Sequence, residues 1–193
     1  MYVLTVDQRR SRADSDRVDQ LLADLPETSV LRPFERTAGD EVQAVLDDPV
    51  AVTDTALELV RRGHWSVGIG LGPVELPLPA STRAGRGPAF EHARSAVDRA
   101  KSAATRLAVD GPDPGAANDA QGVLDLLALL VIRRSEQGWA AVDLVATGAS
   151  QMAAADRLGV TKQAVSQRLR AAGWQQELAG RRVAATLLAN ADR

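Results

Sequence analysis

One stretch of twenty residues, 151–170, constrains this chain more than any other part of its sequence. Gly159 separates two amphipathic segments, at a position that favours a residue tolerating positive φ. Thr161 can cap the second segment through its hydroxyl. Val165 and Leu169 are four residues apart, so both lie on one helical face and can pack against the first segment. The apolar partners expected there are Met152, Ala155 and Leu158. The pattern predicts two short helices joined by a tight turn.

The other face of the second segment carries polar and basic side chains, whose hydrogen-bonding groups suit base edges and phosphates in a major groove. They are Lys162, Gln163, Ser166, Gln167 and Arg170. The stretch resembles the helix-turn-helix of phage repressors and of many bacterial regulators. That resemblance implies contacts of these residues, and of the capping Thr161, with double-stranded DNA. The alternative is a helical hairpin whose polar face is only solvated or contacts another protein.

The charge distribution agrees with a modular DNA-binding protein. The chain has a formal net charge of −2, but residues 150–193 carry +4 and residues 1–149 carry −6. There is no cysteine, which excludes disulfides and thiolate metal sites. We find no run of about 18 apolar residues and no signal-peptide pattern. These features predict a soluble, cytoplasmic protein with no membrane partner.

The remaining sequence predicts two domains. Apolar runs and amphipathic segments in the first half follow the order β-α-β-β-α-β, typical of a ferredoxin-like α+β sheet with helices on one side. Turn-forming residues then predict a linker at 113–118, between an α+β domain (1–112) and an all-α domain (119–193). Residues 119–134 are apolar nearly all round, which indicates a helix that is buried or shared between subunits. The predicted strands are 2–6, 29–37, 41–46, 64–75 and 105–109, and the predicted helices are 15–25, 51–60, 88–103, 119–134, 139–145 and 175–190.

Three pieces of the N-terminal half follow a family pattern in order. Asp7 ends the first strand with Arg12 nearby, and a hairpin reads Gly-Asp-Glu-Val-Gln at 39–43. The third piece is GIGLG at 68–72 with GPAFEHARSAVDRAK at 87–101 behind it. Together these pieces resemble the SatD-like family of small bacterial proteins, which usually carries a helix-turn-helix behind this region.

More distantly, the layout is similar to the palm-type sheet of nucleotidyl cyclases and GGDEF domains. That resemblance implies that Asp7 and Asp40 coordinate Mg²⁺ over a nucleotide, because hard cations prefer carboxylate oxygens. It also implies that Arg94 approaches the phosphates and that the GIGLG strand lines the pocket. Phe90 stands where the cyclases have an Asn, and Val42 replaces the Phe of GGDEF. The pattern therefore favours a sensing site over a catalytic cyclase. From the residues alone, Asp7 can equally be a strand-end residue and Asp40 part of an ordinary turn.

The remaining candidate residues support no other chemistry. His64 and His92 are the only histidines and fall in different predicted elements, so a multi-histidine metal site is excluded. No catalytic residue is predicted. The sequence therefore predicts a sequence-specific transcriptional regulator, acting as a homodimer on a palindrome, with an N-terminal domain that senses a nucleotide. The alternative is a Mg²⁺-dependent nucleotide-binding protein or enzyme that uses the helix-turn-helix as a targeting module.

Overall fold

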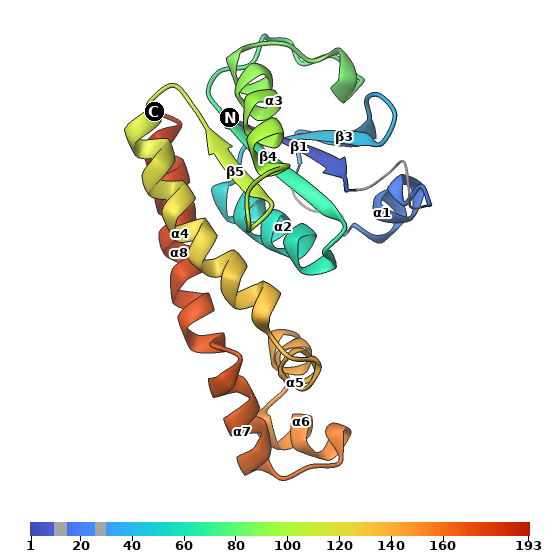
Figure 1. The fold of residues 1–193 in the computed structure, drawn as a ribbon, viewed down its shortest axis with the longest axis vertical. Coiled ribbons are helices and arrows are strands. Elements are labelled where there is room, and N and C mark those ends of the chain that lie inside the picture. Colours follow the sequence, from blue (N-terminus) through green and yellow to red (C-terminus); the bar gives the residue numbers. More distant parts are fainter. Residues whose placement is uncertain (10–14, 26–29) are drawn as a thin grey trace.

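The fold is mixed α+β and is organised by one five-stranded sheet with the strand order β2-β3-β1-β4-β5 (Figure 1). The computed structural model describes residues 1–9, 15–25 and 30–193. The central strand β1 is antiparallel to both of its neighbours, β3 and β4. At the edges, β2 is antiparallel to β3 and β5 is parallel to β4. The strands are β1 (Tyr2–Gln8), β2 (Arg32–Arg36), β3 (Glu41–Leu46), β4 (Trp65–Leu71) and β5 (Leu107–Asp110).

Local sequence explains the irregular edge and the hairpin beside it. The pairing of β2 with β3 shifts register between Arg32 and Glu35, around Pro33. Proline cannot donate a ladder hydrogen bond, which confines it to edges and bulges. Gly39 makes the β2–β3 turn with a φ of 59°. Strand β2 thus lies at the edge of the sheet, and the predicted hairpin between β2 and β3 is confirmed.

Helices cover both faces of the sheet. The two helices of the predicted β-α-β-β-α-β order lie on one face as expected, and a third helix lies on the other. Helices α1 (Val18–Asp24) and α2 (Pro49–Arg62) share a core with one face, and α3 (Pro88–Ala100) covers the other. The reason is the connection between β4 and β5. Parallel neighbours need a crossover, and the crossover helix α3 packs on the face that α1 and α2 leave open.

The glycines of β4 allow α3 to approach the sheet closely. A Cβ atom at Gly68 would lie 2.3 Å from the Val97 nitrogen, and one at Gly70 would lie 2.1 Å from the Ala89 oxygen. The backbone of α3 therefore occupies the space above the GIGLG strand. The expectation that this strand lines a ligand pocket was wrong, because its small residues serve helix packing.

Two long helices, α4 (Pro114–Arg133) and α8 (Trp174–Ala191), pack side by side and join the core under the sheet (Figure 1). Residues 113–118 are therefore no linker. Asp113 caps α4, because its carboxylate accepts hydrogen bonds from the backbone N–H groups of residues 115 and 116 at 2.8 and 3.1 Å. Asp and Pro are common in turns and also at helix N-termini, which explains the incorrect boundary.

Three shorter helices form a small bundle at the far end of α4 and α8 (Figure 1). They are α5 (Glu136–Ala146), α6 (Gln151–Leu158) and α7 (Lys162–Ala171). This bundle has its own cluster of buried residues, separate from the core under the sheet. The fold thus consists of a sheet with its helices, a two-helix stalk and a small helical bundle.

Helix α4 is the one helix in the described ranges that is long and apolar enough to cross a membrane by length and composition. Its apolar window has a mean hydropathy of 1.4, and 33% of that window is buried inside the fold. Leu124 and Leu127 of α4 lie in the core under the sheet. Helix α4 therefore contributes to the core of this fold, although part of its apolar surface stays exposed.

Candidate nucleic-acid interface

The α6–α7 unit begins and turns where the sequence predicts. Ser150 caps α6, because its Oγ accepts a hydrogen bond from the Ala153 backbone N–H at 3.1 Å. Gly159 ends α6 with a φ of 64°. Thr161 caps α7 in the same way, and its Oγ1 accepts from the Ala164 N–H at 3.1 Å. The predicted turn and cap are confirmed.

The inner face of α7 packs much as expected. Val165 and Leu169 are buried together with Ala154 and Ala155 of α6. Met152 was expected to join them but is 55% exposed. It lies on the flank of α6, because the inward face of this short helix is centred on Ala154 and Ala155.

The outer face of α7 carries the six predicted contact residues. Five are exposed, and Ser166 is half-buried. Apart from the Thr161 cap, none of their side chains has a hydrogen bond or ion pair with another described residue. They are Thr161, Lys162, Gln163, Ser166, Gln167 and Arg170. Helix α7 is about 15 Å long, and an α-helix with its side chains is about 10–12 Å in diameter, which fits a major groove about 12 Å wide.

A buried ion pair holds the C-terminal end of α7. Arg134 donates to the carboxylate of Glu177, and their side chains are 0% and 1% exposed. Arg134 also donates two hydrogen bonds to the Ala172 carbonyl, from Nε at 3.2 Å and from Nη2 at 2.9 Å. Sequence reasoning missed this pair, because nothing in the pattern distinguishes Arg134 from the exposed Arg133 beside it.

A second set of contacts ties the small bundle to α2. Arg61 of α2 lies 3.7 Å from the centroid of the Trp139 ring and makes two hydrogen bonds to the Asp143 carboxylate, at 2.8 and 2.7 Å. The Arg134 guanidinium lies 4.2 Å from the same ring centroid. Two cations thus contact one indole, a favourable arrangement with an aromatic ring. These contacts fix the orientation of the bundle relative to the sheet.

The predicted metal pair, Asp7 and Asp40, lies at one end of β1 and its hairpin neighbour. The Gln8 backbone N–H donates to the Asp40 carbonyl at 3.3 Å. Burial raises the pKa of Asp7, and the negative charge of Asp40 adds to that rise, whereas Lys101 opposes it. The Lys101 ammonium lies 3.1 Å from the Asp7 carboxylate. The two carboxylates are therefore neighbours, and a protein ammonium group meets one of them.

Arg94, the predicted phosphate ligand, pairs instead with a different carboxylate. Its guanidinium forms an ion pair with Glu41, whose side chain is 6% exposed. Thr37 donates to the same Glu41 carboxylate at 2.7 Å. The Arg94 side chain is 58% exposed, so one edge of its guanidinium remains accessible. Sequence reasoning did not identify Glu41 as this partner.

A groove of about 630 Å³ runs beside Arg94, between β3 and the start of α3. Gln43, Arg86 and Phe90 line it together with Arg94, whereas Asp7 and Asp40 do not. This groove therefore holds one of the three predicted nucleotide residues, Arg94, and not the other two. Arg12, the fourth residue of the family pattern, lies outside the described residues.

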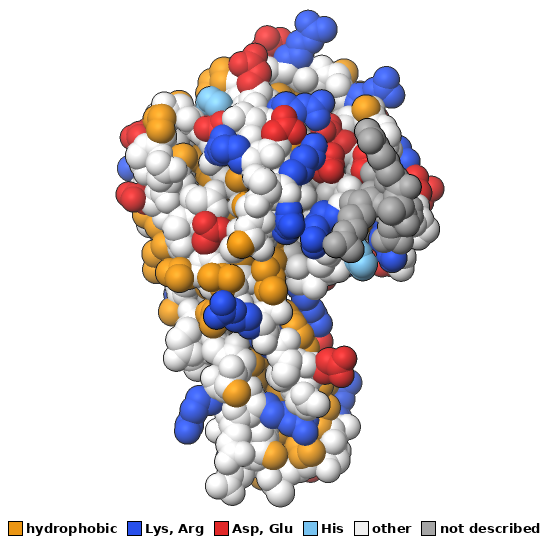
Figure 2. All heavy atoms as spheres, in the orientation of Figure 1, with side chains coloured by type: hydrophobic (Ala, Val, Ile, Leu, Met, Phe, Trp, Pro, Cys, Tyr) orange, Lys and Arg blue, Asp and Glu red, His pale blue; other side chains and the backbone are white. Residues whose placement is uncertain are grey.

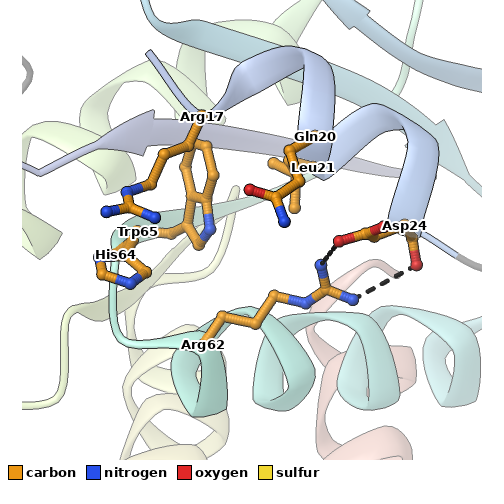
Figure 3. A pocket seen from close by; sticks show the side chains of 7 residues that line it. All are labelled: Arg17, Gln20, Leu21, Asp24, Arg62, His64 and Trp65. Carbon is orange, nitrogen blue, oxygen red and sulfur yellow. Dashed lines mark hydrogen bonds and ion pairs between the residues drawn. The ribbon is translucent and has the colours of Figure 1, made fainter. Parts of the chain in front are cut away.

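The other polar groups supply no obvious metal site. Within residues 1–9, 15–25 and 30–193, no group of three His, Cys, Asp or Glu side chains could hold a metal ion. His92 Nδ1 lies 2.7 Å from the Leu71 carbonyl, as expected for a structural histidine. His64 lines a hollow of about 260 Å³ between α1, α2 and β4 (Figure 3).

That hollow is lined by Arg17, Gln20, Leu21, Asp24, Arg62, His64 and Trp65. Arg62 reaches across it to the Asp24 carboxylate at 3.7 Å (Figure 3). Arg62 is also bonded to Glu58 at 3.1 Å. Because Arg62 already pairs with two carboxylates, we assign no ligand to this hollow.

Comparisons with known proteins add no family to these observations. The chain matches no protein-family model, and searches of curated proteins and of solved structures found no significant match. The SatD-like and cyclase-like resemblances therefore remain predictions from the sequence.

Proposed function

We propose that this protein is a sequence-specific DNA-binding transcriptional regulator that inserts α7 into the major groove. The observation that carries the proposal is the outer face of α7. Apart from the Thr161 cap, its hydrogen-bonding side chains have no partners among the described residues, while the helix itself is capped at Thr161, packed through Val165 and Leu169, and held at its C-terminal end by Arg134. Polar groups that the fold leaves unpaired can bind a ligand without breaking internal contacts.

The position of each side chain suggests its role. The N-terminal residues of a recognition helix contact base edges, so Lys162, Gln163 and Ser166 are the proposed base contacts. Glutamine can bond two atoms of adenine, and Lys suits the acceptors of guanine. Gln167 and Arg170 lie one and two turns further along and reach the base edges or phosphates. Thr161, at the helix N-terminus, is placed for a phosphate.

The test is a selection of the full-length protein against fragmented genomic DNA, with the bound fragments sequenced. We expect one enriched motif. A double variant, Lys162→Ala with Gln163→Ala, should lose the motif because it removes two proposed base contacts. Arg83→Ala removes an exposed arginine on the sheet body and serves as the matched control, which should retain the motif.

Two outcomes would count against the proposal. Retention of fragments without a common motif would indicate binding through phosphates alone. No retention would leave α7 as a surface for protein contacts.

A second candidate function is Mg²⁺-dependent nucleotide binding at Asp7 and Asp40. It is favoured by the proximity of the two carboxylates and by the raised pKa of Asp7, since groups with perturbed pKa values are frequent at functional sites. The order β2-β3-β1-β4, with β3 between β1 and β2, is also that of a ferredoxin-like split βαβ sheet. Under this reading Mg²⁺ displaces Lys101 from Asp7, and Arg94 meets the phosphates from the groove.

Thermal unfolding with a panel of nucleoside triphosphates and Mg²⁺ tests this second candidate. Ligand binding should raise the Tm by mass action, and a double variant, Asp7→Ala with Asp40→Ala, should abolish the shift. Asp98→Ala removes the other acidic partner of Lys101 and is the control that should keep the shift. A panel without any shift would rule out a functional site.

A further inference from the structure

Helix α4 leaves an apolar face uncovered. Leu126 is 67% exposed and Leu130 is 36% exposed, and the half-buried Leu129 lies between them. These side chains and Arg133 line a groove of about 540 Å³ that Ala171, Ala172 and Gln176 close on the other side. Figure 2 shows hydrophobic side chains gathered over this part of the molecule, between the sheet and the small bundle. Single exposed leucines are common, but a lined groove of this kind indicates a partner.

The two halves of this face, on either side of Leu126, are complementary in charge and shape. Asp119 and Arg133 each lie seven residues from it, on opposite sides of the same helical stripe. Both are exposed, and neither has an ion pair with another described residue. Gly122 and Leu130 each lie four residues away, again on opposite sides. No atom lies within 4 Å of the place where Gly122 would carry a Cβ, so an open notch faces solvent there.

We propose that this α4 face, made of Asp119, Gly122, Leu126, Leu129, Leu130 and Arg133, joins two copies of the chain. The two α4 helices pack antiparallel about a two-fold axis at Leu126. Leu130 then enters the notch at Gly122 of the partner subunit, and Asp119 meets Arg133 of the partner subunit. Each contact occurs twice, because a two-fold interface uses the same patch on both copies.

This arrangement explains two features that the monomer does not. It gives Asp119 and Arg133 an opposite charge each, and it covers the most exposed leucine of α4. The face spans about four turns of one helix. The area that it can bury is therefore smaller than the roughly 1,600 Å² of an average stable interface. We therefore expect a reversible dimer with a Kd on the order of micromolar.

The dimer also constrains how DNA could be bound, although the interface itself does not depend on the proposed function. The small bundle extends from the C-terminal end of α4, so antiparallel packing puts the two α6–α7 units at opposite ends (Figure 1). Two half-sites bound by one dimer would then be separated by more than one helical turn of DNA.

Sedimentation velocity of the full chain without DNA tests the interface. The parent protein should shift from monomer to dimer between concentrations on the order of 1 and 100 µM. Leu126→Asp should remain monomeric over this range. The matched control is Leu76→Asp, at a leucine that is 69% exposed in the loop after β4 and does not line the α4 groove, and it should dimerise like the parent. A parent protein that stays monomeric would overturn the proposal.

The charged pair provides a test of register. Asp119→Arg and Arg133→Asp should each weaken dimerisation at least tenfold, because each places like charges opposite one another. The double variant should recover the parent affinity. Additive losses in the double variant would overturn the antiparallel register.

The absence of cysteine permits a direct test of proximity. Leu126→Cys should form an intermolecular disulfide under mild oxidation, because the two-fold axis places the two Cβ atoms close enough for the sulfurs to bond to each other. Leu76→Cys should not. Equal cross-linking of the two variants would contradict the proposed axis, whether or not either substitution alters stability.

Discussion

The outer face of α7 and the N-terminal region around Asp7, Glu41 and Arg94 are both rich in polar side chains. They differ in how many of these side chains already have hydrogen-bond or ion-pair partners within the protein. On α7, Lys162, Gln163, Gln167 and Arg170 make no bonds within the described chain. In the N-terminal region, Lys101 meets Asp7, Glu41 meets Arg94, and Thr37 bonds Glu41.

This difference matters for binding energy. A side chain without an internal partner loses only its hydration when it binds a ligand, whereas a paired one must also give up its partner. The α7 face is therefore the better prepared of the two for a new ligand. At the Asp7 end, a ligand must first displace an ammonium group.

The largest expected effect is on the support of α7. Glu177→Ala leaves the buried Arg134 guanidinium without its carboxylate, and we expect a loss of about 3–5 kcal/mol in the free energy of unfolding. Denaturant unfolding measures it. Glu91→Ala, at an exposed acid of α3, should change stability by less than about 0.5 kcal/mol. A loss of that smaller size for Glu177→Ala would mean that the buried pair does not anchor α7.

Arg94→Ala tests how much the paired polar residues of the N-terminal region contribute to stability. It leaves the buried Glu41 carboxylate with the Thr37 hydroxyl as its remaining side-chain partner among the described residues. Because Arg94 is more than half exposed, solvent screens part of the effect, and we expect a loss of about 1–2 kcal/mol in the free energy of unfolding. Urea unfolding beside Arg83→Ala would measure this. No loss of stability would show that the Arg94 side chain, like those on the outer face of α7, makes no internal contact that stabilises the fold.

Arg170→Ala should behave in the opposite way. It removes no internal contact, so the free energy of unfolding should change by less than about 0.5 kcal/mol. Affinity for the selected DNA motif should fall about tenfold, equivalent to about 1.4 kcal/mol. Fluorescence anisotropy at fixed salt gives the affinity, and thermal unfolding of the same sample gives the stability. Unchanged affinity would remove Arg170 from the interface.

The smallest effect is expected at Asp7. Because its pKa is raised above the ordinary 3.8, the ionised carboxylate is less favourable in the folded chain than in the unfolded chain. Its contribution to stability therefore improves as pH falls through the raised folded pKa towards 3.8.

Asp7→Asn should accordingly be at least as stable as the parent at pH 7, with the difference vanishing below about pH 4. Unfolding curves at both pH values measure it, with Asp98→Asn as the control at the exposed partner of Lys101. A clear loss of stability in Asp7→Asn at pH 7 would mean that the ion pair with Lys101 outweighs the effect of burial.

Local sequence was sufficient for the parts of the fold that depend on neighbouring residues. The cap at Thr161, the turn at Gly159 and the inward Val165 and Leu169 could all be predicted, because capping, positive φ and helical periodicity act within a few residues. The strand order of the sheet was only partly predictable. The position of α3 could not be predicted, because it depends on how Gly68 and Gly70 contact the backbone of a helix that begins only at Pro88.

The sequence by itself determined the alternation of strands and helices and the polar outer face of α7, since both follow from side-chain periodicity. Only the tertiary structure decided which charges are used internally. Arg134 and Glu177 lie 43 residues apart, and Arg94 and Glu41 lie 53 residues apart. No local pattern identifies such pairs, because an ion pair forms wherever packing brings two side chains together. The same packing left Leu126, Asp119 and Arg133 of α4 at the surface, although the sequence alone indicated only that this helix is apolar.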